Sequence, residues 1–222
     1  MKRRRRARAL IPVAIVCLLL AQSNALSQSQ SQPLPRYEAA VEFSSLGRDG
    51  IGGTRNEAGV GARFTVNLNE MFALEAAGYI FPRRCFECLE AGRMTQAVGG
   101  VKVGKRFDTW GVFAKARPGV VSFSEAQIVS FVTVVPPALF PFGLERERVT
   151  SFATDVGGVV EFYPSRRIVT RFDVGDTIIH FTKRTGDVVI FDGTGGTQVI
   201  PVTRPARTEH EFQFNASVGF RF

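Results

Sequence analysis

Two cysteines lie close enough in the sequence to act together: Cys85 and Cys88 have a C-x-x-C spacing. A structural zinc site would require a second pair of cysteines or histidines, and the only two histidines, His180 and His210, are far away in the sequence. A thioredoxin-like redox motif would require a βα unit, and no helical periodicity follows the cysteines. In an exported chain, which meets an oxidising compartment, this spacing favours a small loop disulfide.

The two histidines are the other candidates for chemistry. His180 is followed by a hydroxyl at Thr182, but the sequence places no acid where it would obviously orient the imidazole. His210 stands next to Glu211 in the chain and does not face it. The glycine-rich segment 192–197 lacks the Gly-Lys-Ser/Thr of a phosphate loop, so it indicates a turn. We therefore expect no enzyme activity, no cofactor and no metal site.

The first 25 residues have the three parts of a secretory signal peptide. Residues 2–8 are rich in Lys and Arg, residues 9–21 are apolar, and residues 23–25 offer a small-residue cleavage site. The apolar run is much shorter than the roughly 20 residues that a membrane-spanning helix needs. The sequence predicts a signal peptide over residues 1–25, followed by a flexible periplasmic tail over residues 26–36 that is rich in Ser, Gln and Pro.

Removal of the signal peptide changes the charge balance of the chain. The full sequence has 28 Lys and Arg residues against 20 Asp and Glu residues, which gives a net charge of +8. The signal peptide holds six of the basic residues and no acid, so 22 basic and 20 acidic residues are left. A nucleic-acid partner would need a clustered basic face, and a nearly neutral chain argues against such a partner. The remaining length is enough for one domain.

The last thirteen residues alternate between apolar and polar side chains. Phe212, Phe214, Ala216, Val218, Phe220 and Phe222 share one parity. Successive side chains of a β-strand point to opposite faces, so this pattern is typical of a strand between two unlike environments. Eight segments have the pattern, over residues 37–44, 60–68, 72–81, 96–107, 110–117, 151–163, 168–174 and 210–222.

The connections between these segments alternate between short and long. Short turns lie at residues 69–70, 108–109 and 164–167, and long connections lie at residues 45–59, 82–95, 118–150 and 175–209. Two-residue turns exclude a parallel sheet, because parallel strands need a long crossover. The sequence predicts an all-β fold over residues 37–222, namely an eight-stranded antiparallel up-and-down transmembrane β-barrel with short periplasmic turns and long external loops.

Two of the long connections contain patterns of their own. Within residues 118–150, the stretch from Val129 to Phe142 is unusually apolar. It is either a contact patch for lipid, a protein partner or a hydrophobic ligand, or a continuation of the fifth and sixth strands beyond the membrane, which we favour. Within residues 175–209, strands at 187–191 and 198–202 around the glycine-rich turn indicate an additional hairpin.

Alternation alone does not decide which face of the barrel meets lipid. A soluble lipocalin-like barrel would bury the apolar face, but no G-x-W motif lies near the first strand. Aromatic residues gather at the short-turn ends, as in the girdle of a membrane barrel. They are Phe72, Phe107, Trp110, Phe162, Phe220 and Phe222. The sequence therefore favours an apolar face that meets lipid.

The polar face then lines the interior, and its charges are balanced. The acids are Glu38, Glu42, Glu75, Asp155, Glu161, Asp173 and Glu211, and the bases are Arg63, Lys102, Arg106, Lys115, Arg117, Arg171 and Arg221. An eight-stranded barrel is just wide enough for side chains to fill it, and charges enclosed there must pair. We expect a salt-bridged, largely closed interior. If water surrounds these charges, the barrel is instead a narrow channel for small or hydrophobic solutes.

These features resemble the small eight-stranded outer-membrane barrels of the OmpA-transmembrane and OmpX type. The resemblance covers residues 37–222, and the terminal Phe220-Arg221-Phe222, with Phe214 and Val218 before it, is similar to the family's C-terminal assembly signal. It implies a monomer in the bacterial outer membrane, with membrane lipid and the barrel-assembly machinery as partners. The implied role is structural or in surface interaction, through an external ligand or partner of the loops. Modification of lipid A, which some small barrels perform, is the less favoured alternative.

Overall fold

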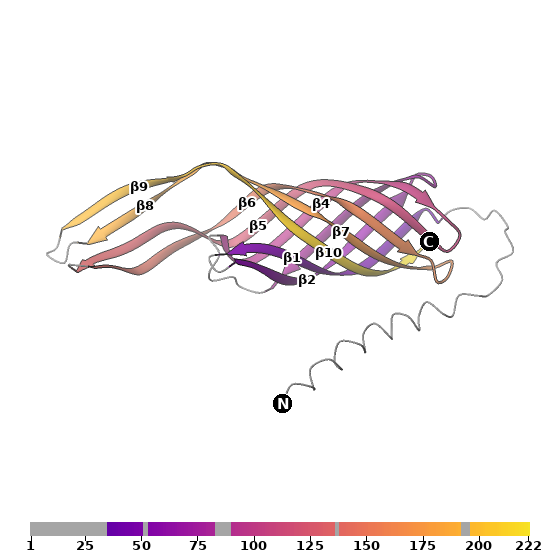
Figure 1. Ribbon diagram of the computed structural model, residues 1–222, viewed down its shortest axis with the longest axis horizontal. Coiled ribbons are helices and arrows are strands. Elements are labelled where there is room, and N and C mark those ends of the chain that lie inside the picture. Colours follow the sequence, from indigo (N-terminus) through magenta and orange to yellow (C-terminus); the bar gives the residue numbers. More distant parts are fainter. Residues whose placement is uncertain (1–34, 51–52, 83–89, 136–137, 192–195) are drawn as a thin grey trace, which may run out of the picture. The chain divides into compact units, whose positions relative to one another are not determined.

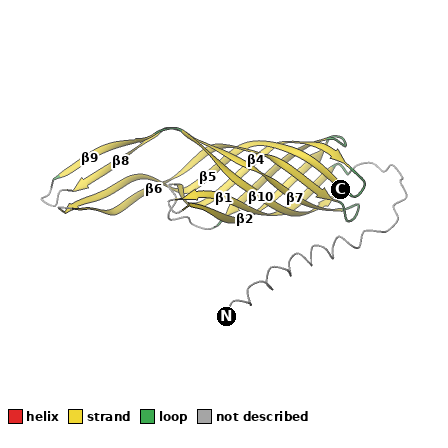
Figure 2. Cartoon of the chain, in the orientation of Figure 1, coloured by secondary structure: helices red, strands yellow, loops and turns green. Residues whose placement is uncertain are grey.

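The computed structural model describes residues 35–50, 53–82, 90–135, 138–191 and 196–222, and all regular structure in this part of the chain is β-strand (Figure 2). The strands are β1 (Tyr37–Gly50), β2 (Gly53–Asn67), β3 (Phe72–Phe81), β4 (Glu90–Arg106), β5 (Trp110–Val135), β6 (Ala138–Phe162), β7 (Ile168–Phe181), β8 (Arg184–Phe191), β9 (Thr197–Arg204) and β10 (Arg207–Arg221). None of the described residues belongs to a helix that is long and apolar enough to cross a bilayer.

Several predicted features lie outside the described residues. They are the signal peptide, the tail up to residue 34, and both members of the predicted Cys85–Cys88 disulfide, and all of them stay predictions. The last two residues of the predicted tail are described, and both are hydrogen-bonded to Asn67. The Asn67 side chain donates to the Pro35 carbonyl at 2.9 Å, and its backbone N–H donates to the Arg36 carbonyl at 2.8 Å.

Eight of the strands close into an antiparallel barrel (Figure 1). Neighbours follow the order β4-β3-β2-β1-β10-β7-β6-β5, and pairing between β4 and β5 closes the ring. The first and last strands of the chain meet along a continuous register, from Glu38 opposite Arg221 to Leu46 opposite Gln213. The predicted eight-stranded antiparallel barrel is therefore confirmed.

The hairpin predicted between the seventh and eighth barrel strands is also confirmed. β8 and β9 pair in antiparallel fashion, from Arg184 opposite Arg204 to Phe191 opposite Thr197. β8 pairs in parallel with β5 as well, from Val129 opposite Asp187 onward. These contacts begin beyond Ala126, the last residue of β5 that pairs with β4. The sheet thus continues past the barrel in the order β6-β5-β8-β9.

At the end of the barrel opposite the short turns, here the extended end, the strands are longer than expected. β5 and β6 pair from Trp110 opposite Phe162 to Val135 opposite Ala138, so most of the connection expected at residues 118–150 is a strand pair. This confirms that the fifth and sixth strands continue. The alternation of apolar and polar residues is weaker in this part of β5 and β6. Backbone hydrogen bonds can pair two strands without one face of the sheet being shielded from water. Side chains 127–145 lie outside the described set, so the apolar patch is untested.

The alternation places apolar side chains outside and polar side chains inside. On β1, Val41 is 72% exposed, whereas the next residue, Glu42, is 4% exposed. Aromatic rings gather on the outer face at the short turns, where the Phe107 and Trp110 rings stack with centroids 4.4 Å apart. An apolar outer band with an aromatic edge and a charged interior is the reverse of a soluble protein and matches a bilayer. The fold is that of a transmembrane β-barrel.

Candidate functional site: the barrel interior

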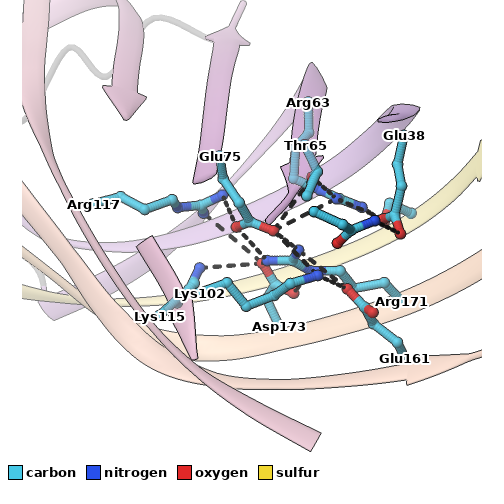
Figure 3. A network of polar contacts seen from close by, with 12 residues as sticks. Glu38, Arg63, Thr65, Glu75, Lys102, Lys115, Arg117, Glu161, Arg171 and Asp173 are labelled. Carbon is cyan, nitrogen blue, oxygen red and sulfur yellow. Dashed lines mark hydrogen bonds and ion pairs between the residues drawn. The ribbon is translucent and has the colours of Figure 1, made fainter. Parts of the chain in front are cut away.

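Glu75 of β3 is the centre of a buried ion-pair network (Figure 3). Arg171 of β7 donates to both of its carboxylate oxygens. The carboxylate also lies 3.6 Å from Lys102 Nζ, 3.7 Å from an Arg63 nitrogen and 3.5 Å from an Arg117 nitrogen. All five side chains are buried. Because each is at an inward position of a different strand, barrel closure brings four cations onto one carboxylate.

Asp155 and Asp173 bind the cations near β5 and β6. Lys115 Nζ lies 3.0 Å from Asp155 and 3.2 Å from Asp173. Arg117 donates to Asp155 at 2.5 Å, and Arg171 donates to Asp173 at 2.5 Å and 2.9 Å. Arg117 is the direct cross-strand partner of Asp155, so this ion pair follows from the β5–β6 register alone.

Glu161 and Glu38 extend the network toward the short turns. Glu161 contacts Lys102 and lies 3.7 Å from Arg106. Glu38 also lies 3.7 Å from Arg106, and 3.3 Å from Arg221 of the last strand. Arg106 therefore links two carboxylates that come from strands far apart in the sequence, β1 and β6.

Tyr163, in the short turn after β6, adds a neutral donor at this end of the interior. Its hydroxyl donates to Glu161 at 2.9 Å and accepts from Arg106 Nε at 3.0 Å. The Arg221 guanidinium lies 4.4 Å from its ring centroid. Burial raises the pKa of the Tyr163 phenol, and the adjacent Glu161 carboxylate raises it further, so the hydroxyl keeps its proton.

Glu42 joins the network from β1. Arg63 Nε donates to it at 2.8 Å, and the Tyr79 hydroxyl donates to its other oxygen at 2.5 Å. Gly61 makes room for the Tyr79 ring, because a Cβ at position 61 would collide with ring carbons. The glycine at this position thus allows an aromatic hydroxyl to reach a buried carboxylate.

The structure connects thirteen of the fourteen charged residues expected in the interior into one network, and Glu211 contacts Arg48. Glu211 is 4.0 Å from Arg48, and Arg48 also pairs with Glu57 at 3.0 Å. The sequence did not point to Arg48 or Glu57 as interior charges, because both fall in the connection expected at residues 45–59. Their inward parity, continued from the predicted parts of β1 and β2, is the signal that could have identified them.

Between these two groups of charges lies a layer of uncharged polar side chains. Gln213 of β10 accepts from Thr177 at 2.5 Å and donates to Ser44 at 2.9 Å. The Gln213 amide also exchanges hydrogen bonds with Gln96 of β4. Side chains from four strands are thereby joined across the interior without any net charge.

An apolar layer follows toward the extended end and was not predicted. Its buried members include Leu46, Phe81, Met94, Val121, Phe123, Ile179 and Phe181. The rings of Phe123 and Phe181 lie 5.8 Å apart, with the Arg48 guanidinium 4.9 Å from the Phe123 centroid. Most of these residues lie beyond the predicted strand ends, so the sequence indicated only the polar part of the interior.

The residues expected to form an assembly signal share the outer face of β10. Phe214 is half-buried, and Val218, Phe220 and Phe222 are exposed. The backbone of Phe222 exchanges two hydrogen bonds of 2.9 Å with Tyr37, and the two rings lie 5.8 Å apart. The last residue thus pairs with the first residue of β1. A role as a recognition signal stays a prediction.

This interior is built for packing and charge pairing. Within the described ranges, no group of three or more His, Cys, Asp or Glu side chains could hold a metal ion. The network positions side chains from opposite walls against one another, which is what a small barrel needs when its interior is filled. Fold and interior together define a small transmembrane β-barrel with an ion-paired interior.

No protein-family model and no curated protein matches the chain. Among solved structures, it is similar to Neisserial surface protein A, with 10% identity and a TM-score of 0.48 over 84% of this chain and 97% of that chain. It is also similar to Yersinia pestis Ail, the attachment invasion locus protein, in complex with the heparin analogue sucrose octasulfate. That similarity has 9% identity and a TM-score of 0.48 over 86% of this chain and 100% of that chain. A third similarity is to the N-terminal β-barrel domain of Pseudomonas aeruginosa OprF, with 9% identity and a TM-score of 0.43 over 86% of this chain and 100% of that chain.

Proposed function

We propose that this protein is a bacterial outer-membrane barrel with a sealed interior and a structural or surface-interaction role, without enzymatic activity. Exposed apolar side chains on the outer face, such as Val41, Phe172 and Val218, support a location in lipid. The predicted signal peptide supports export. β1 begins and β10 ends at the short turns, which in outer-membrane barrels face the periplasm. The extended end then faces the exterior.

The main observation in support of a sealed interior is that four cationic side chains converge on Glu75. These side chains come from five strands and meet in the middle of the barrel. Separating them would leave a buried charge without a partner, which is strongly unfavourable. The apolar layer around Phe123 lies across the same interior and would oppose the hydration of an ion. Both layers therefore support a barrel that does not conduct.

The continuation of the sheet past the extended end supports a surface role. β5 and β6 continue well beyond the barrel register, and β8 and β9 add to the same sheet. On β9, the side chains of Val199, Ile200 and Val202 are exposed. Exposed apolar residues on strands outside a membrane band are typical of contact surfaces. We place the external partner or ligand on this part of the protein.

Conductance across a planar lipid bilayer tests the proposal. The refolded wild-type protein should insert without steady open levels. The double variant Glu75→Ala with Phe123→Ala shortens one side chain in each layer, and it should conduct more than the wild type. Steady open levels for the wild type would favour a narrow channel for small or hydrophobic solutes. A change in lipid A mass on expression would contradict the absence of enzyme activity.

A further inference from the structure

The only two histidines of the chain lie on the outer face of adjacent strands, at diagonal positions of the β7–β10 pair. His180 of β7 is directly opposite Thr208 of β10, and its Nδ1 lies 3.2 Å from the threonine hydroxyl. His210 lies two residues further along β10, with its Nδ1 2.6 Å from an oxygen of Asp176. The structure thus supplies the acid beside His210 that the sequence did not reveal. Two histidines far apart in the sequence become neighbours only through the β7–β10 register.

Each imidazole is oriented by a polar neighbour on the adjacent strand. The Asp176 carboxylate accepts from His210 Nδ1–H, and the Thr208 hydroxyl can donate to His180 Nδ1. His180 is also stacked against the outer-face ring of Phe152, with centroids 5.7 Å apart. In both rings Nδ1 is the bonded nitrogen, so Nε2 is the atom available to a ligand.

These side chains lie at the edge of the apolar outer band. Phe212 is the next outer-face residue of β10 below His210, and it is 61% exposed. From Phe212 to the last residue, Phe222, β10 crosses the band in a span close to the roughly 9–11 residues of a tilted transmembrane strand. His210 and Asp176 thus stand at the height of lipid headgroups.

Two further exposed cations lie further along the same strands, beyond these residues. Arg148 is exposed, four residues before Phe152 on the same parity of β6, and Lys183 is exposed just after β7 ends. Together with the imidazoles, these groups offer several N–H donors above an apolar surface, with the carboxylate of Asp176 among them and those of Glu147 and Glu209 at adjacent positions of β6 and β10. A lipid with an anionic headgroup matches this arrangement of an apolar surface next to N–H donors. Its acyl chains would cover Phe212, and its headgroup would reach the donors.

We propose that the outer face of β6, β7 and β10 at the extended end binds the phosphate-bearing headgroup of an outer-leaflet lipid, with His180 Nε2–H as the central donor and the protonated form of His210 as the second. The proposal rests on the proposed membrane location but not on a sealed interior. His180 Nε2–H donates to a phosphate oxygen, and Asp176 orients the His210 ring toward the same headgroup. Arg148 and Lys183 provide charge at the edge of the site.

Native mass spectrometry of the full-length mature protein, released from detergent micelles, tests this site. The probes are phosphatidic acid and diacylglycerol with identical acyl chains, which differ only in the phosphate. The wild type should retain phosphatidic acid and not diacylglycerol. The variant His180→Ala with His210→Ala should bind phosphatidic acid about tenfold more weakly, in line with the loss of hydrogen bonds to a charged group. The variant Asn56→Ala with Arg93→Ala, on exposed positions of β2 and β4, should bind like the wild type.

Equal retention of phosphatidic acid by the wild type and the histidine variant would overturn the proposal, and so would retention of diacylglycerol at the same level. Displacement of the lipid by millimolar inorganic phosphate would mean that a free anion, and not a lipid, is the occupant. Unboiled gel mobility of both variants reports whether the barrel is folded. Because bilayer conductance is measured separately, an open interior and a missing headgroup site would be told apart.

Discussion

At the scale of the residue, Arg171 holds the interior together. It contacts Glu75 and Asp173, and its side chain is fully buried. Arg171→Met keeps the approximate volume of the side chain but removes a positively charged partner from Glu75 and Asp173. It should therefore lower the free energy of unfolding by about 3–5 kcal/mol. Urea unfolding of the protein refolded into lipid vesicles measures this loss. Arg166→Met, in the exposed turn before β7, is the matched control and should change stability little.

The same reasoning separates the two faces of one strand. On β10, Ser217 points inward, where Arg63 donates to its hydroxyl at 3.4 Å, whereas Val218 is 56% exposed on the outer face. An aspartate at position 217 would meet a cation, and an aspartate at position 218 would meet lipid. Ser217→Asp should therefore be milder than Val218→Asp in the same unfolding assay. The reverse ranking would mean that the apolar face is inside.

At the scale of the element, the closing strand depends on its last residue. Phe222 exchanges two backbone hydrogen bonds with Tyr37, and its ring packs beside Tyr37 and Phe220. Deletion of Phe222 should reduce the fraction of protein that assembles in the outer membrane, measured as the fraction with folded mobility on an unboiled gel. Phe222→Tyr keeps the ring and the backbone pairing, and it should assemble normally. Full assembly of the deletion variant would refute the assembly-signal assignment.

The β8–β9 hairpin is an element that the barrel does not need. Phe181 and Arg207 are direct partners in the β7–β10 pair, so their strands can be joined by a two-residue turn. Replacement of residues 182–206 by Asn-Gly should leave the barrel folded, because none of the eight barrel strands loses a barrel neighbour. Circular dichroism and unboiled gel mobility check this outcome. Loss of the folded band would show that closure depends on the pairing between β8 and β5.

At the scale of the whole molecule, closure of the sheet predicts resistance to detergent. A closed barrel has no free edge, so local fraying does not begin as it does in an open sheet. The protein should stay in the membrane after an alkaline carbonate wash, and it should migrate differently on gels before and after boiling. Removal by the wash together with unchanged mobility would instead indicate a soluble barrel whose apolar face is inside.

The sequence by itself determined the local properties of this fold. Alternation is a property of consecutive residues, so the segment His210–Phe222 was sufficient to separate two unlike faces, and the aromatic residues at the short-turn ends then favoured the parity that places Glu75 and Arg171 in the interior. Short turns such as Asp108-Thr109 required antiparallel neighbours. The eight strands and the inward charges therefore followed from short windows of sequence, without any knowledge of what lies across the barrel.

The tertiary structure decided which of these residues meet. Glu75 and Arg171 are 96 residues apart, and their contact depends on the register of every strand between them and on closure of β4 against β5. The same holds for His210 beside Asp176, which the β7–β10 register brings together. The apolar layer around Phe123 became visible only once the strands were seen to continue past their predicted ends. Parity is local and can be read from a short sequence, whereas register and closure are set by the whole sheet.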